Sequence, residues 1–549
     1  MTGQAPRIRF MTIGLDIGSS SIKAIVLGRG GSTAMAARRS LVTRRRPGGR
    51  VEQEPEEILR RAVECLESAA RTAGPGPPAD PSGAPRLGIA TQRSTVLFWD
   101  RDTGRPLTPA YSWQDLRGST LCARIAGRAT ARVREVAERT GLRLSPHYSA
   151  SKIAWALRHV PGLRRKAAAG RALWGPLGSF ILWRLTGGAV YAVDHANAQR
   201  TLLVDLPSLT WDPGLFDLFG VQALLDAPAL PALVPTSLSM EIEVTLRGGR
   251  ARLQAVTGDQ QAALLGLGCR RPGDVCINYG SGAFVLKNVG AVPARSSGLL
   301  TTILASWSEP GGGPGAPAAR FALEGTVNSA ATAIDWAERR LGIRVRTADI
   351  DRFLGPDDGR PRTVHFLPAV AGLGAPRWDP GARPRFEGDV AGASPRDLLR
   401  AVVESIACRC TEIARASDAG RAPRDRTPSG RREAPVLVAG GLVRCGALLQ
   451  AQADLLGRPL LVSNSPDATA LGAAVLAAHG PLRVFERTSQ SRPAARAEGV
   501  RLVRPRLPRG EAEARFRAWE RAVYGPEGGA GRVAGPAAAA PRRGRIARS

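Results

Sequence analysis

Val-Thr-Gly-Asp-Gln-Gln-Ala-Ala-Leu-Leu, residues 256–265, joins an apolar, strand-like run that ends at Val256 to a segment that favours a helix. This junction puts the carboxylate of Asp259 at a helix N-terminus, where the helix dipole favours a negative charge and free N–H groups need acceptors. A carboxylate that faces a cleft there can also take the proton of a substrate hydroxyl. A plain helix cap is the alternative interpretation, and the rest of the chain decides between the two.

A short buried strand at residues 11–16 ends in a second acid, Asp16, and is followed by Gly18-Ser-Ser-Ser-Ile-Lys23 and the apolar run 24–27. We expect a hairpin whose turn offers N–H groups and serine hydroxyls to phosphate oxygens, with Asp16 able to hold a magnesium ion through water. This is not a Walker loop, because the Gly-x-x-x-x-Gly-Lys-Ser/Thr pattern is missing. Taken alone, the turn is more typical of an ordinary hairpin.

The second half of the chain offers a similar turn. Strands expected at 274–278 and 283–288 enclose Tyr279-Gly-Ser-Gly282, which indicates an internal duplication whose two turns grip one phosphate chain. Further on, a strand at 435–438 leads through Ala439-Gly-Gly441 into a helix expected at 446–456. A glycine pair lets a flat ligand such as adenine lie close to the backbone. An Ala-rich helix at 469–479 is expected to pack beneath that site.

Two polar segments suggest a pocket for a small hydroxylated substrate. Thr91-Gln-Arg-Ser94 follows a buried strand at 86–90, at the strand end where open α/β sheets place their ligands. Ser112-Trp-Gln-Asp115 follows beyond the next turn. Arg93 and Trp113 can form a polar clamp and an apolar wall for such a substrate. A surface ion pair and a core tryptophan are the alternative interpretation.

The remaining elements follow from periodicity and turn residues. A polar turn is expected at 194–201, and the lone His147 and His195 are more typical of structural hydrogen bonding than of catalysis. Residues 417–433 are expected to be a surface insertion and residues 525–549 to be disordered. We expect a strand at 366–370 and helices at 53–72, 129–140, 151–157, 175–185, 211–219, 329–341, 398–414 and 511–523.

The composition suits a globular protein of two or three domains. The net charge of +30 would ordinarily point to nucleic acid, but only four of the 77 basic residues are lysines. Arginine accompanied by much Ala, Gly and Pro is what GC-rich codons produce, and it is scattered without a basic and aromatic stripe. Nucleic-acid binding is therefore not expected.

Seven cysteines, an odd number, contain no Cys-x-x-Cys pair. Cys408 and Cys410 would point apart on a helix, so we expect neither a disulfide nor a zinc site. No apolar run is expected to reach membrane-spanning length, and the start of the chain lacks the apolar core of a signal peptide. These features predict a soluble, cytoplasmic protein.

Taken together and in order, these motifs resemble the FGGY carbohydrate kinases, and among them the glycerol kinases most closely. The motifs are 16–23, 91–93, 112–115, 258–264, 279–284, 323–325, 368–380 and 470–474. The resemblance implies an α/β fold of two actin-like, ribonuclease-H-like domains flanking a catalytic cleft for ATP, magnesium and the substrate. It implies an extension at 1–10, a substrate and phosphate domain at 11–254, a nucleotide domain at 255–482 and an Arg/Ala/Pro-rich tail at 483–549.

The resemblance also implies roles for single residues. Asp259 falls on the general base that takes the proton of the attacking hydroxyl, and Asp16 on the residue that organises magnesium. The polyol pocket falls on Arg93, Ser94, Trp113, His147, Gln260 and Phe284. The phosphates and the nucleoside fall on Ser19, Ser20, Ser21, Lys23, Ser281, Ala331, Gly440, Gly441 and Cys445.

Four of these positions depart from the family pattern. Ser94 stands where glycerol kinases have Glu, and His147 where they have Tyr, although Tyr148 can take that place. Ala331 replaces a Gly and Cys445 an Asn. Loss of a carboxylate that accepts a substrate hydroxyl costs about 1–3 kcal/mol, which allows a different substrate.

We therefore expect ATP-dependent phosphorylation of a terminal hydroxyl of a small polyol, with glycerol first. Another polyol or a ketose such as xylulose is the second candidate, and a catalytically impaired sensor of ATP or sugar is the third. The protein is expected to be a homo-oligomer.

Overall fold

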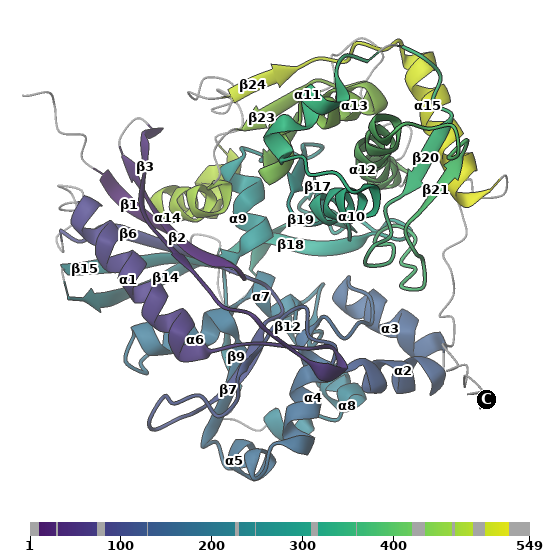
Figure 1. Ribbon diagram of the computed structural model, residues 1–549. Coiled ribbons are helices and arrows are strands. Elements are labelled where there is room, and N and C mark those ends of the chain that lie inside the picture. Colours follow the sequence, from purple (N-terminus) through teal and green to yellow (C-terminus); the bar gives the residue numbers. More distant parts are fainter. Residues whose placement is uncertain are drawn as a thin grey trace, which may run out of the picture.

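The computed structural model (Figure 1) describes residues 10–28, 31–73, 83–128, 130–225, 230–247, 249–308, 317–357, 359–419, 434–463, 467–486 and 500–525. Two α/β lobes lie side by side, the first drawn in purple and blue and the second mostly in green and yellow. The predicted α/β class is confirmed. Most of the extension predicted at 1–10 lies outside the described residues, and Phe10 already begins the first strand.

A six-stranded sheet in the order β14-β15-β6-β1-β2-β3 forms the first lobe. The predicted hairpin is confirmed, because β1 and β2 are antiparallel on either side of the serine turn. β6 runs parallel to both β1 and β15, so the carboxyl ends of these three strands meet at one edge of the sheet. The strands are β1 (Phe10–Ile17), β2 (Ser21–Gly28), β3 (Thr33–Ser40), β6 (Arg86–Thr91), β14 (Ser237–Leu246) and β15 (Gly249–Gly258).

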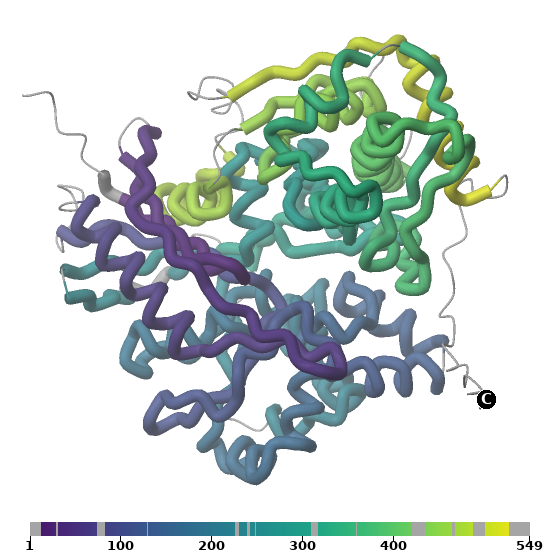
Figure 2. Tube along the Cα trace, in the orientation of Figure 1, coloured from purple at the N-terminus to yellow at the C-terminus, as the bar shows by residue number. Residues whose placement is uncertain are grey.

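Helices cover both faces of this sheet. Ile13 and Leu15 of β1 pack in one core cluster with apolar residues of α1 (Pro55–Ala73). Gly14 faces the opposite way, towards α14 (Ala468–Glu486), since a Cβ at Gly14 would lie 2.0 Å from the carbonyl oxygen of Ala470. Figure 2 shows this helix, far along the chain, beside the purple strands of the N-terminus. Because side chains alternate along a strand, Asp16 points to the same side as Gly14.

A smaller five-stranded sheet and several helices complete the first lobe below its main sheet. The sheet has the order β4-β5-β8-β7-β9. The strands are β4 (Arg44–Arg46), β5 (Arg50–Gln53), β7 (Val96–Asp100), β8 (Ala110–Tyr111) and β9 (Ala172–Pro176). The helices are α2 (Ser119–Arg128), α3 (Thr130–Thr140), α4 (Ser149–His159), α5 (Leu163–Ala168), α6 (Leu177–Leu185), α7 (His195–Gln199) and α8 (Pro213–Phe219).

The second lobe repeats the topology of the first. Its seven-stranded sheet has the order β18-β19-β17-β16-β22-β23-β24. Three antiparallel strands, β16, β17 and β19, continue into the parallel strands β22 and β23, as β1, β2 and β3 continue into β6 and β15. This agrees with the predicted duplication. The strands are β16 (Val275–Tyr279), β17 (Ala283–Gly290), β18 (Leu300–Trp307), β19 (Ala318–Val327), β22 (Val436–Gly440), β23 (Leu460–Ser463) and β24 (Val500–Val503).

Helices of the second lobe surround this sheet and include part of the predicted tail. β24 pairs with β23, and Trp519 of α15 donates a hydrogen bond of 2.9 Å to the carbonyl of Phe366. Residues 487–499 and 526–549 of the tail, and 420–433 of the insertion, lie outside the described residues. The helices are α9 (Asp259–Gly266), α10 (Ala331–Leu341), α11 (Ile350–Leu354), α12 (Pro395–Asp418), α13 (Gly446–Leu456) and α15 (Arg509–Tyr524).

The polar turn predicted at 194–201 is wrong, because most of it forms the buried helix α7. Two of its polar side chains, those of His195 and Gln199, form hydrogen bonds with β18 of the other lobe. Gln199 donates to the carbonyl of Thr301 at 2.7 Å and accepts from the N–H of Ile303. The Nδ1 atom of His195 lies 2.8 Å from the hydroxyl of Ser306, which confirms the structural role expected for this histidine.

Two further expectations concern α14 and the cysteines. α14 is long and apolar enough to cross a membrane, so the expectation that no run reaches this length is wrong. The helix is nevertheless largely buried, because its small residues pack against the first sheet and α9. All seven cysteines carry free thiols and are buried.

Candidate active site

Three predicted site segments meet at the edge where β1, β6 and β15 end. In the sheet register Ile17 pairs with Thr91, and Thr91 with Gly258. Asp16 is one residue before Ile17 on β1, and Asp259 is one residue after Gly258 on β15. Burial raises the pKa of Asp16 to about 7, and the carboxylates of Asp259 and Asp467 add to the rise while Lys23 opposes it. The two acids singled out in the sequence are therefore electrostatic neighbours.

Asp259 is the first residue of α9, and Gly258 is its N-cap. Because Gly258 holds the N-cap position, the interpretation of Asp259 as a plain N-cap is wrong. The Oδ1 atom of Asp259 accepts a 2.7 Å hydrogen bond from the N–H of Gln260. The side chain is 25% exposed, which leaves it open to a substrate. Burial raises the pKa of Asp259, while the nearby charge of Arg93 opposes the rise. A carboxylate with these properties can receive a proton.

Arg93 lies between Asp259 and a carboxylate of the second lobe. Its Nη1 and Nη2 atoms donate to the two oxygens of Glu324 on β19 at 2.8 and 3.0 Å. Its Nε atom lies 3.3 Å from Oδ1 of Asp259. This bidentate pair fixes the plane of the guanidinium and leaves one edge for Asp259.

A second arginine supports this pair. Arg200, directly after α7, donates to Glu324 at 2.5 Å and to the hydroxyl of Thr302 at 2.8 Å. Burial alone would raise the pKa of Glu324, but Arg200 and Arg93 lower it to about 2. Arg200 was expected only as part of a polar turn, and Glu324 only as part of its motif. The partner of Arg200, Glu324, lies 124 residues away in the sequence. The one sign of this role in the sequence was therefore the presence of an arginine in the polar segment 194–201.

The other predicted pocket residues come from both lobes. Ser94 has a left-handed backbone with φ 65°. The Nδ1 atom of His147 lies 3.0 Å from the carbonyl of Trp113, and the two rings lie 6.4 Å apart. From the second lobe, Gln260 accepts a 3.4 Å hydrogen bond from Asn278, which pairs with Phe284 between β16 and β17.

Tyr148, the suggested stand-in for the family tyrosine, is buried, unlike the exposed His147. The negative charge that Tyr148 would carry if ionised acts on the pKa of Arg93, which places its hydroxyl near the arginine cluster. Burial raises the pKa of Tyr148, and Arg200 opposes the rise. The phenol is therefore a neutral neighbour of the arginines.

Hydrogen bonds from Gln53 and Gln92 hold the first serine turn in place. The carbonyl of Ser19 accepts a 2.8 Å hydrogen bond from Gln53, and Gln53 accepts one of 2.8 Å from Gln92. Ser20 is exposed at the tip of the turn, whereas Ser21 is buried at the start of β2. Lys23 forms an ion pair of 3.5 Å with Asp467, the residue before α14.

The second turn lies against the start of α10. The carbonyl of Ser281 accepts hydrogen bonds from the N–H groups of Ala330 at 2.8 Å and Thr332 at 3.2 Å, and the carbonyl of Gly280 accepts one from Ala331 at 3.2 Å. Ser281 itself is exposed. Ser281 and Ala331, predicted from separate motifs, are therefore neighbours.

The two glycines of the predicted nucleoside site, Gly440 and Gly441, differ in the space around them. Gly440 has φ 104°, and a Cβ there would lie 2.0 Å from the carbonyl of Tyr279. Gly441 is exposed, and a Cβ there would have no atom within 4 Å. The predicted role of Cys445 fits less well, because its thiol is buried and lies 3.9 Å from Asp351.

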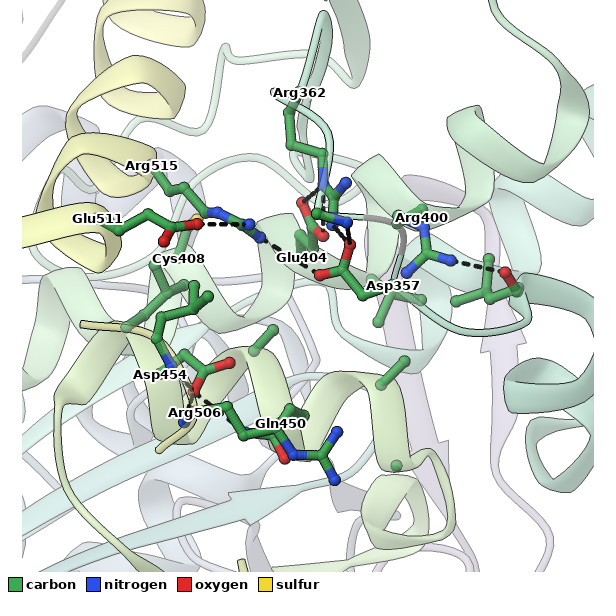
Figure 3. A pocket seen from close by; sticks show the side chains of 18 of the residues that line it. Asp357, Arg362, Arg400, Glu404, Cys408, Gln450, Asp454, Arg506, Glu511 and Arg515 are labelled. Atoms are coloured by element: carbon green, nitrogen blue, oxygen red, sulfur yellow. Dashed lines mark hydrogen bonds and ion pairs between the residues drawn. The ribbon is translucent and has the colours of Figure 1, made fainter. Parts of the chain in front are cut away.

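A cavity of about 900 Å³ lies elsewhere in the second lobe, among α11, α12, α13 and α15 (Figure 3). None of the predicted site residues lines it. Arg362 donates to Asp357 at 2.8 Å and to Glu404 at 2.9 Å, and Arg515 donates to Glu511 at 2.8 Å. Each of these five side chains is therefore paired with an opposite charge.

Family models match most of the chain. The N-terminal domain model of the FGGY family of carbohydrate kinases matches residues 11–266, and the C-terminal domain model matches residues 275–480. The chain belongs to the FGGY family of carbohydrate kinases. The family expected from the sequence is confirmed.

Curated relatives and solved structures agree with this assignment. The chain is 37% identical to a glycerol kinase of Bordetella parapertussis, over 93% of the chain and 96% of the relative. It is 38% identical to a glycerol kinase of Thermus brockianus, over 94% and 98%. The fold is similar to that of Plasmodium falciparum glycerol kinase with ADP, with a TM-score of 0.77, 23% identity and coverage of 94% and 98%. A xylulose kinase from Rhodospirillum rubrum has a TM-score of 0.73, 23% identity and coverage of 93% and 97%. These structures confirm the two actin-like domains.

Proposed function

We propose that this FGGY kinase transfers the γ-phosphoryl group of ATP to a terminal hydroxyl of glycerol and forms glycerol 3-phosphate. The observation that carries the proposal is Asp259, a partly exposed carboxylate at a strand end, with a raised pKa and Arg93 beside it. The names of the curated relatives support glycerol as the acceptor.

In this mechanism Asp259 accepts the proton of the attacking hydroxyl while the oxygen forms a bond to the γ-phosphorus and ADP leaves. Arg93 orients the acceptor and holds the carboxylate of Asp259 in place. Trp113 and Phe284 form apolar walls, and Gln260 and His147 offer polar atoms to the remaining hydroxyls. Phosphoryl transfer depends mainly on such positioning and on charge neutralisation.

The phosphates are assigned to the two turns and the nucleoside to the glycine pair. Ser19, Ser20 and Lys23 approach from the first lobe and Ser281 from the second. The open space above Gly441 suits a flat base, and Ala331 adjoins the second turn. Ser21 and Cys445 are buried, so we assign them to support of the site.

A divalent cation, and specifically Mg²⁺, fits the carboxylate of Asp16. Its pKa is raised by burial and by two neighbouring carboxylates, which is the environment that a bound cation relieves. Within the described residues no group of three potential metal ligands occurs, so we assign Asp16 alone and expect water to complete the coordination. The cation would neutralise phosphate charge.

Another polyol or a ketose such as xylulose is the second candidate, because Ser94 replaces a carboxylate that accepts a substrate hydroxyl. The experiment is ADP release by the purified protein with ATP, Mg²⁺ and a panel of glycerol, other polyols, ketoses and aldoses. The proposal expects the highest kcat/KM with glycerol. A higher kcat/KM with a ketose would favour the second candidate. If no substrate leads to ADP release while ATP still binds, a sensor would be favoured.

We also propose that the protein is cytoplasmic and homo-oligomeric. Seven buried free thiols suit a reducing compartment. Sedimentation of the purified protein tests the oligomeric state, and a monomer across the tested concentrations would contradict this part of the proposal.

A further inference from the structure

Lys152, in the first turn of α4, is completely buried and makes an unusual set of contacts. Its ammonium group donates hydrogen bonds to three backbone carbonyls, those of Ser94 at 2.8 Å, Ser112 at 2.9 Å and His147 at 2.8 Å. The three carbonyls belong to three separate loops, which follow β6, follow β8 and precede α4. One side chain therefore joins loops that lie up to 58 residues away in the sequence.

These are the loops that carry the polyol pocket. Ser94 is itself a pocket residue and directly follows Arg93, Ser112 directly precedes Trp113, and the third carbonyl belongs to His147. The distances between these loops determine the width of the pocket on its first-lobe side. Lys152 touches their backbones from behind and contributes no atom to the pocket surface, since it is fully buried.

A cation at this place is costly. Burial lowers the pKa of Lys152 to about 7, with Asp115 opposing and Arg117 adding to the effect. The positive end of the α4 dipole also disfavours a cation in the first turn. Within the described part of the chain no carboxylate forms an ion pair with Lys152. The three hydrogen bonds to carbonyls offset this cost, and an apolar side chain here would leave these carbonyls without their ammonium donor.

The choice of lysine over arginine supports a geometric role. The chain uses arginine for almost all of its basic residues, and only four lysines occur. An ammonium has three N–H donors in a pyramid around one atom, and these can converge on three carbonyls. A guanidinium is a planar fork that cannot reproduce this arrangement.

The Ser94 carbonyl is held twice, because Ser149 also donates to it at 3.3 Å. This carbonyl belongs to the residue with the left-handed backbone, a conformation that is strained for a residue with a side chain. The two donors from α4 help to maintain it and so fix the direction in which Ser94 and the preceding Arg93 leave the sheet.

We propose that Lys152 is a positioning residue that sets the spacing of Ser94, Trp113 and His147 and thereby determines which polyol the pocket accepts. This inference rests on the proposed function, since it concerns the acceptor pocket of that reaction. The nucleotide site is built from other loops, so Lys152 acts on the acceptor and not on ATP.

The test compares three variants with the wild type in steady-state kinetics. Lys152→Met removes the three donors at nearly constant volume, and Lys152→Arg keeps the charge but not the geometry. Lys287→Met is the matched control, a buried lysine of the second lobe that donates to the carbonyl of Ser417 at 3.0 Å. For each variant we would measure KM for glycerol, KM for ATP and the ratio of kcat/KM for glycerol to that for xylulose.

Both Lys152 variants are expected to raise KM for the polyol about tenfold or more and to lower the substrate ratio, because small misplacements of binding groups are costly. KM for ATP should stay within about twofold of the wild type, and Lys287→Met should leave the ratio of the two KM values unchanged. If the wild type is active and Lys152→Met has the same ratio of KM for the polyol to KM for ATP, this inference is overturned while the proposed function stands. If Lys152→Arg has wild-type kinetics, the geometric role of the lysine is overturned.

If Lys152→Met does not fold, the variant Ser149→Ala tests the inference instead. It removes the second donor to the Ser94 carbonyl and should raise KM for the polyol about two- to threefold with KM for ATP unchanged, since one neutral hydrogen bond makes only a modest net contribution. An unchanged KM for the polyol in Ser149→Ala would then overturn the inference. A wild type that phosphorylates no member of the panel overturns the proposed function, and this inference with it.

Discussion

The carboxylate of Glu324 in the second lobe accepts two hydrogen bonds, at 2.8 and 3.0 Å, from the guanidinium of Arg93 in the first. Arg200 approaches the same carboxylate from α7. This buried Arg-Glu-Arg cluster joins the two lobes directly behind Asp259, so the position of the proposed base depends on both lobes at once.

Glu324→Gln should destabilise the protein strongly. The substitution leaves two buried guanidinium groups without their counter-charge, and breaking a buried ion pair in this way typically costs about 3–5 kcal/mol. Urea unfolding followed by tryptophan fluorescence would measure the loss. As a control, Glu243→Gln removes an exposed ion pair with Arg250 on the hairpin of β14 and β15 and should cost less than about 1 kcal/mol. Equal losses in the two variants would contradict this account.

The contribution of Glu324 should also depend on pH. The folded-state pKa of about 2 lies below the ordinary value of 4.5. The stabilisation is therefore fully present above pH 4.5 and is lost as the pH falls from 4.5 towards 2. The difference in unfolding free energy between the wild type and Glu324→Gln should be constant from about pH 7 to pH 5 and shrink below that. A difference that grows on acidification would have the wrong sign.

Asp259→Asn should abolish most of the phosphoryl transfer. Loss of a general base typically lowers the rate by about 10²–10⁴-fold, while ATP binding, measured by calorimetry, should stay close to that of the wild type. Asp102→Asn, at an exposed turn between β7 and β8, is the matched control and should leave both quantities unchanged. Turnover by Asp259→Asn at the wild-type rate would remove Asp259 from the role of base.

Gly14→Ala should disturb the packing of α14 on the first sheet. The added methyl group would lie 2.0 Å from the carbonyl oxygen of Ala470, which is backbone and cannot rotate away. We expect a loss of at least about 1–3 kcal/mol, as is typical of overpacking. Thermal unfolding measures it, with Gly441→Ala as the control because its added methyl group meets open space. If Gly14→Ala unfolds at the same temperature as the wild type, the close packing of Gly14 against Ala470 is refuted.

Gly441→Val should separate nucleotide binding from stability. The exposed side chain meets no protein atom at its Cβ, so the fold should be unchanged. It would occupy the space assigned to the nucleoside, and KM for ATP should rise about tenfold, which corresponds to about 1.4 kcal/mol. KM for the polyol should stay constant. If KM for ATP is also unchanged, the nucleoside lies elsewhere.

The sequence was sufficient for features that depend on local pattern. The hairpin of β1 and β2, the helix that starts at Asp259 and the late helix α15 follow from apolar spacing and turn residues. The meeting of Asp16, Arg93 and Asp259 could be expected too, because each follows a buried strand and parallel strands align their carboxyl ends.

Features that depend on distant partners could not be read from it. Residues 194–201 look like a surface turn because they are polar, yet Gln199 and Arg200 are buried against β18 and β19 of the other lobe. Lys152 is similar, because its position in a helix says nothing about the three carbonyls around it. Local periodicity reports which face of an element is apolar and not which polar groups will meet.

The packing of α14 has a consequence for the order in which the chain can fold. Gly14 and Gly88 of the first sheet are covered by α14, which is synthesised only after the strands of the second lobe up to β23. While the ribosome is still making the second lobe, one face of the first sheet lacks its cover. The first lobe therefore cannot mature as an independent N-terminal unit, as domains in a nascent chain usually do. A fragment that ends after α9 should behave as an incomplete, aggregation-prone protein, and co-expression with a segment containing α14 is the way to make it soluble.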